Sequence, residues 1–177
     1  MTRIFKFLLA TLAALILSGC ASLDVNRMVP EISSVPANKF DKTIVVKKVT
    51  GAQEESFAGP AMVSDEQFKQ SLAQALDQSG MFRDVVTEGS ADLEMSAEFV
   101  AQGQGAGLNY MSALVVEYLI VDSASQDEVW SDAYNSRHEV KVSEALSGAK
   151  RTVRAAEGSV RKNIAQLLEG LAEADLD

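Results

Sequence analysis

Few residues in this chain have the types and spacing that catalysis or metal binding requires. His138, in "NSRHEV", is the single histidine, and no serine or cysteine stands beside it in a recognisable nucleophile motif. One histidine and one cysteine do not form the clustered ligand set of a zinc site. The sequence therefore predicts no catalytic residue, no metal site and no cofactor. The protein is expected not to be an enzyme, although plentiful carboxylates leave a paired-carboxylate site open as an alternative.

A glycine-rich stretch, "GQGAG" from Gly103 to Gly107, superficially resembles a phosphate-binding loop. It lacks the lysine and the serine or threonine of a P-loop, and it does not join a strand to a helix. We expect a flexible hairpin connection there instead.

The single cysteine, Cys20, lies in "ILSGCASLD". Two cations, Arg3 and Lys6, open the chain, and an apolar run from Phe7 to Leu17 follows them. A membrane-spanning helix needs about 20 apolar residues, and this run is roughly half that length, as in a secretory signal. A lone cysteine also excludes an intrachain disulfide. An uncleaved anchor and a buried free cysteine are the alternatives.

Leu17, Ser18, Gly19 and Cys20 resemble the lipobox of bacterial lipoproteins. The resemblance implies cleavage before Cys20, a diacylglycerol on its thiol and an N-acyl chain, such as palmitate, on its new amine. Several acyl chains anchor a protein where one would dissociate. Ala21 stands where an aspartate retains enterobacterial lipoproteins in the inner membrane. We therefore expect a lipid anchor in the periplasmic face of the outer membrane.

Three parts of the chain follow from this interpretation. Residues 1–19 form a cleaved signal peptide, residues 20–39 form the lipidated N-terminus and a flexible tether, and residues 40–177 form one α+β domain. Cleavage removes two cations and no acid, so the mature chain has 14 basic and 25 acidic residues and a net charge of −11. Such a body is repelled by nucleic acid and by anionic lipid, so we expect it to stay off the membrane on its tether.

Hydrophobic periodicity predicts the elements of this domain. Strands are expected over residues 42–50, 91–102, 110–122 and 129–142, and helices over about 65–79 and 149–173. Ser64 and Gln67 have the spacing of a capping box before the first helix, and Gly80 is placed to end it. Residues 91–102 alternate, with Leu93, Met95, Ala97, Phe99 and Ala101 on the apolar face.

The predicted fold is a two-layer α+β sandwich with the order β-α-β-β-β-α. About four mainly antiparallel strands form the sheet, and both helices cover its apolar face. On the last helix, Glu157 precedes Arg161 by four residues, the order of a favourable helical ion pair. Gly158 interrupts the same helix, which favours close contact with the sheet.

Two groups of apolar residues are candidates for binding a partner. Phe57, Pro60 and Met62 lie in the long connection "EESFAGPAM", where exposed apolar side chains often serve recognition. Trp130 and Tyr134 share a strand face, and Tyr118 is expected near them. Packing over the sheet edge is the alternative for the loop, and core packing is the alternative for Trp130 and Tyr134.

Two stretches resemble an uncharacterised family of small proteobacterial lipoproteins. One runs from "VKKVTGAQEE" to "DQSGMF" and contains the family's Val-Thr-Gly turn. The other, "KRTVRAAEGSVRKNIAQLLEGL", has an Ala-Asn-Glu-Gly run and a later Asn-Ile. Glu157, Gly158, Arg161, Asn163 and Ile164 match the second pattern, whereas Ala156 replaces its asparagine. The resemblance covers most of residues 42–171 and implies an envelope lipoprotein without an established activity.

These observations favour a non-enzymatic accessory or interaction module of an envelope assembly or transport system. Its expected partners are the membrane, through the anchor, and another envelope protein, but not nucleic acid. A carrier of a small apolar or lipid ligand is the alternative, suggested by the leucine-, valine- and alanine-rich faces. An envelope hydrolase is the least favoured hypothesis.

Overall fold

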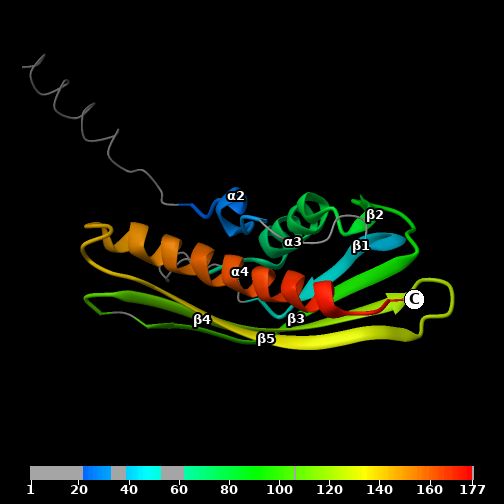
Figure 1. The fold of residues 1–177 in the computed structure, drawn as a ribbon. Coiled ribbons are helices and arrows are strands. Elements are labelled where there is room, and N and C mark those ends of the chain that lie inside the picture. Colours follow the sequence, from blue (N-terminus) through cyan, green and yellow to red (C-terminus); the bar gives the residue numbers. More distant parts are fainter. Residues whose placement is uncertain (1–21, 33–38, 53–61, 106, 177) are drawn as a thin grey trace, which may run out of the picture.

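The computed structural model describes residues 22–32, 39–52, 62–105 and 107–176, which form two layers (Figure 1). In chain order the elements are α2 (Val25–Met28), β1 (Phe40–Thr50), α3 (Asp65–Ser79), β2 (Phe82–Val86), β3 (Leu93–Gly105), β4 (Tyr110–Asp122), β5 (Glu128–Val140) and α4 (Gly148–Glu173). The helices lie on one face of the sheet, with α4 running along β4 and β5. The predicted α+β sandwich is therefore approximately right.

The sheet is mixed and five-stranded, in the order β2-β1-β3-β4-β5. β3, β4 and β5 form the predicted antiparallel meander, whereas β1 is parallel to both β2 and β3. β2 and the parallel pairing were not predicted from the sequence. β1 and β2 are parallel because α3 connects them as a crossover, which returns the chain in its original direction.

Strand β3 keeps its predicted alternation over most of its length. Leu93, Met95, Ala97 and Phe99 are buried against the helices. The pairing with β4 shifts between Phe99 and Ala101, which marks a bulge. Ala101 is therefore exposed, and its predicted place on the apolar face is wrong.

Helix α3 has the predicted bounds and caps. The Ser64 hydroxyl accepts from the Gln67 N–H, and the Gln67 side chain accepts from the Ser64 N–H. Gly80 adopts φ of 62°, a left-handed conformation that glycine reaches without Cβ strain. Phe68, Leu72, Ala75 and Leu76 are buried, as the helical spacing predicts.

Helix α4 packs closely on the sheet through two glycines and a buried polar network. A Cβ on Gly158 would overlap the His138 ring, and one on Gly170 would overlap the Tyr134 hydroxyl. The predicted contact of Gly158 with the sheet is thus confirmed. Beside it, the Tyr118 hydroxyl donates to Asn163 Oδ1 at 2.6 Å, and Asn163 Nδ2 donates to the Tyr134 carbonyl at 2.8 Å. These bonds fix the position of α4 along β4 and β5.

Lys39, just before β1, and Lys42 of β1 bind the C-terminal part of α4 and the residues after it. Lys39 Nζ donates to the carbonyls of Leu171 and Ala172, at 3.3 and 2.5 Å, and Lys42 Nζ donates to the carbonyl of Leu176. The last turn of α4 contains no basic residue of its own. Lys39 therefore supplies the positive charge that carbonyls at a helix C-terminus favour, and Lys42 binds the segment that follows the helix.

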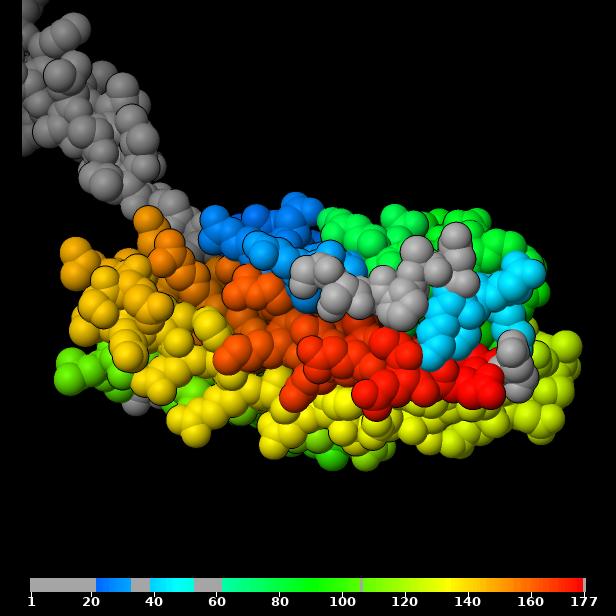
Figure 2. Space-filling model, in the orientation of Figure 1, coloured from blue at the N-terminus to red at the C-terminus, as the bar shows by residue number. Residues whose placement is uncertain are grey.

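Residues 22–32, which we name the strap, pack on the domain instead of forming part of a flexible tether. The strap lies against α4 and α3 (Figures 1 and 2). Leu23, Met28 and Val29 are buried in the common core, and Met28 is fully covered. The structure thus corrects the tether prediction for this segment, because three apolar side chains find a surface on the helices. The rest of the predicted tether lies outside the described residues.

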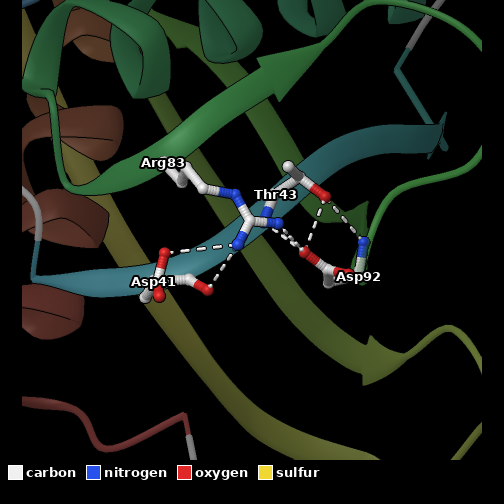
Figure 3. A network of polar contacts seen from close by, with 4 residues as sticks. All are labelled: Asp41, Thr43, Arg83 and Asp92. Carbon is white, nitrogen blue, oxygen red and sulfur yellow. Dashed lines mark hydrogen bonds and ion pairs between the residues drawn. The ribbon is translucent and has the colours of Figure 1, made fainter.

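A polar clasp holds the parallel part of the sheet together (Figure 3). Arg83 of β2 bridges Asp41, at 3.2 Å, and Asp92, at 2.8 Å. The Asp92 carboxylate also accepts from the backbone N–H and hydroxyl of Thr43, at 2.8 and 2.9 Å. These bonds, and more weakly the charge of Arg83, lower the pKa of Asp92. Every group of the clasp is engaged in joining β1, β2 and β3, so its role is structural.

Candidate functional site

The predicted site residues fall into three groups. Leu17, Ser18, Gly19, Cys20, Phe57 and Pro60 lie outside the described residues. Met62 is 7 % exposed and joins the core, so it offers little surface to a partner. Trp130 and Tyr134 are partly buried and pack against the core under α4, and the Tyr118 and Tyr134 rings lie 6.1 Å apart, as expected. A role of Trp130 or Tyr134 in partner binding stays a prediction.

His138 is half-buried against Gly158 on the inner side of β5. Burial, together with the positive charges of Lys162 and Arg161, lowers the pKa of its imidazole. The ring is therefore neutral at pH 7 and serves as a packing surface for α4. Among the described residues, no three histidine, cysteine, aspartate or glutamate side chains gather as metal ligands would.

Glu157, which lies on α4 under the strap, has a role that its sequence context did not predict. Its side chain is 3 % exposed, and its carboxylate accepts from the Asp24 N–H at 3.0 Å. Arg27 of α2 is 3.8 Å from the other carboxylate oxygen. Burial raises the pKa of Glu157, while the Asp24 N–H and the Arg27 charge act in the opposite direction. Glu157 thus holds the strap at the point where it meets α4.

The expected pairing of Glu157 with Arg161 is replaced by these contacts. Arg161 Nη1 donates to the carbonyl of Arg27 at 3.1 Å, so it also binds the strap. Two charged groups from successive turns of α4 therefore hold one backbone segment. Their shared partner lies more than 130 positions away in the sequence, and no local pattern signals it.

The sheet face that the helices leave uncovered, which we name the open sheet face, has a hollow across β1, β3, β4 and β5. Its volume is about 530 Å³. Its lining includes Lys48, Glu98, Glu117, Leu119 and Ala133. Glu98 and Glu117 are exposed and stand directly opposite each other in the antiparallel register. Like charges in such a cross-strand pair destabilise a sheet, so packing alone does not account for them.

The layer between helices and sheet is filled by side chains. The largest fully buried ones include Tyr118, Phe68, Met28, Leu72, Leu114 and Ile164. None of the helices in the described part of the chain has the length and apolar character to cross a membrane.

Comparisons with known proteins show the fold and no family. No protein-family model matches the sequence, and no curated protein does. The structure is similar to protein XCC0632 of Xanthomonas campestris, from the family DUF330, with a TM-score of 0.60 and 12 % identity over 82 % of this chain and 93 % of that one. It is also similar to the hypothetical protein CT253 of Chlamydia trachomatis, with a TM-score of 0.57 and 10 % identity over 76 % of this chain and 98 % of that one.

A weaker likeness links the chain to lipoprotein GNA1162 of Neisseria meningitidis. The TM-score is 0.46 and the identity 12 %, over 78 % of this chain and all of that one.

Proposed function

We propose that this protein is a lipoprotein of the bacterial envelope, anchored through Cys20 in the periplasmic face of the outer membrane. Its α+β domain acts as a non-enzymatic interaction module for another envelope protein. The observation that carries the proposal is the position of the strap: Leu23, the first buried residue among those that the structure describes, is only three positions after the lipobox cysteine. A lipid on Cys20 would therefore attach directly to a folded unit.

Metabolic labelling with palmitate tests the anchor. The wild-type chain should incorporate label, and Cys20→Ala should not. Ser22→Ala, close to the lipobox but outside it, is the matched control and should label like wild type. Absence of label in the wild type, or equal label in Cys20→Ala, would contradict the proposed anchor.

The open sheet face is the surface that we propose for the partner. It presents Glu98 and Glu117 side by side at an internal energetic cost, and it surrounds them with exposed polar and apolar side chains. A basic or amide-rich segment of another protein would offset the repulsion between these carboxylates, so we expect the partner to present such a segment.

Site-specific photo-crosslinking in intact cells tests this surface. A photoreactive residue at Ala133, on the open sheet face, should give an adduct of defined mass, and Glu117→Lys should abolish it. The same residue at Gln70, exposed on α3, is the control and should give no such adduct. Identical adduct patterns at both positions, or none at Ala133, would contradict the proposed surface.

The apolar carrier remains the second hypothesis from the sequence. No specific observation favours it, because side chains fill the layer between sheet and helices among the described residues. Protein binding therefore stands first.

A further inference from the structure

The exposed charges of α4 are distributed against the helix dipole. Lys150, Arg154, Arg161 and Lys162 lie in its N-terminal two thirds, whereas Glu169 and Glu173 lie near its C-terminus. Lys150 in the first turn of α4 and Glu173 in its last turn both carry the charge that the dipole disfavours, whereas the dipole has little effect on the cations farther inside the helix. Helix stability therefore does not explain this order.

The cations of α4 are also not neutralised within the described residues. Arg154 and Arg161 donate to the carbonyls of Glu144 and Arg27, and Lys162 donates to the carbonyl of Arg137. None of the three has a carboxylate within 4.0 Å among the described residues. Arg154, Arg161 and Arg27 line one open hollow of about 310 Å³ that also contains Glu144 and the buried Glu157. The three arginines outnumber the two carboxylates of this hollow, and of the three only Arg27 has carboxylate partners, Asp24 and Glu157, among the described residues.

Exposed apolar side chains lie at the same end of the domain. Leu108, in the turn between β3 and β4, is 82 % exposed, and Leu146, in the loop before α4, is 90 % exposed. Val142 of the same loop is 42 % exposed. Asn109 ties the two loops together, because its Oδ1 accepts from the Val142 N–H at 3.4 Å. Both loops lie at the end of the molecule where α4 begins (Figure 1).

The strap brings the chain to this end. Asp24 is fixed to Glu157, and four residue steps separate it from Cys20, which places the two Cα atoms at most about 14 Å apart. A lipid on Cys20 is therefore held close to the basic part of α4. We name this combination of cations and apolar loops the basic end.

We propose that the basic end rests on the anionic headgroup surface of the bilayer that carries the anchor. Lysine and arginine side chains bind headgroup phosphates, and the leucine side chains of the two loops enter the boundary between headgroups and acyl chains. The acidic C-terminus of α4 and the open sheet face lie away from this contact. The inference rests on the proposed anchor, and it revises the expectation from net charge, because the cations are concentrated where the chain meets the membrane.

A fluorescent label on the lipidated protein tests this contact. Lipidation blocks the thiol of Cys20, so an environment-sensitive dye attaches to Leu146→Cys alone. The protein is reconstituted on vesicles of phosphatidylcholine, with or without about one third phosphatidylglycerol. On the anionic vesicles the dye at position 146 should shift to the blue. Ala124→Cys, in the exposed turn between β4 and β5 at the opposite end, is the matched control and should not respond.

Charge variants complete the test. Each cation near an anionic surface contributes about a fivefold factor in binding, so Lys150→Gln with Arg154→Gln should lower the equilibrium constant of this membrane contact on the order of 25-fold. Lys69→Gln, on α3, should leave it unchanged. Equal dye responses at positions 146 and 124, or a shift insensitive to both lipid charge and the Lys150→Gln, Arg154→Gln double variant, would overturn the inference. If a second dye molecule attached to Cys20, the Cys20 thiol would be free, and this result would contradict the proposed lipid anchor instead of the membrane contact.

Discussion

The contact between Glu157 and the strap yields a quantitative prediction for Glu157→Ala. The substitution removes a charged acceptor from the Asp24 N–H, a bond that contributes about 1.5–3 kcal/mol. The Arg27 charge, which is 58 % exposed, adds a few tenths of a kcal/mol to about 1 kcal/mol. Loss of the buried carboxylate also removes its desolvation cost. We therefore expect the free energy of opening the strap to fall by about 2 kcal/mol.

Limited proteolysis with trypsin measures this opening. The bond after Arg27 leads into the fully buried Met28, so cleavage there requires the strap to leave α4. When opening is fast relative to cleavage, the rate follows the population of the open form. A change of about 2 kcal/mol then corresponds to roughly 30-fold faster cleavage after Arg27. Mass spectrometry identifies the product that lacks the residues up to Arg27.

Glu169→Ala, at an exposed position of the same helix, is the matched control and should cleave at the wild-type rate. If Glu157→Ala also cleaved at that rate while both proteins kept their thermal midpoint, Glu157 would not hold the strap. Our reasoning about the buried carboxylate would then be refuted.

The pH dependence of Glu157 gives an independent check. Its pKa in the folded protein is raised above the ordinary value of 4.5, so the folded state holds more protons than the unfolded state just above that pH. This carboxylate therefore makes the free energy of unfolding decrease as the pH rises from about 4.5. Glu157→Gln keeps an acceptor for the Asp24 N–H and removes the titration. Its stability relative to wild type should increase from pH 4.5 to pH 7 in urea unfolding, and a constant difference would contradict this prediction.

Three further predictions concern packing and charge in the sheet. Gly158→Ala should lower stability by about 1–2 kcal/mol because the new methyl overlaps the His138 ring, and adding His138→Ala should recover most of the loss in thermal unfolding. Asp92, whose pKa is lowered in the folded state, contributes stability that is lost as the pH falls through and below its ordinary value of 3.8; Asp92→Asn should flatten that acid limb. Glu117→Gln should raise stability by about 0.2–1 kcal/mol by relieving repulsion with Glu98, yet weaken crosslinking to the partner; lower stability in urea unfolding would oppose this reasoning.

The elements that the sequence predicted well are those with local signals. The reciprocal bonds of Ser64 and Gln67 begin α3, and the alternation from Leu93 to Phe99 marks β3. Both patterns act through neighbours in the sequence, so the chain itself carries the information. The long apolar stripe of α4 belongs to the same class.

The features that the sequence did not predict depend on residues that are distant in the sequence. β2 is only five residues long and has two exposed charges, so its burial pattern does not alternate. The strap has no periodicity, and its apolar residues gain a surface only when α3 and α4 are in place. Glu157 has the helical position of a solvated charge, and only the strap buries it. For the candidate surfaces, the composition predicted the total charge of the domain. The separation of cations and anions onto different parts of its surface arises from the tertiary structure.

The contact between the strap and Glu157 also determines an order of folding events during biogenesis. Asp24 and Glu157 are 133 positions apart, and α4 follows all the other described elements in the sequence, so it is synthesised after them. The strap therefore stays undocked until α4 has folded. If the proposed function is correct, the enzymes that process the lipobox act while the strap is still undocked. The strap then packs on α4 after processing, next to the new N-terminus.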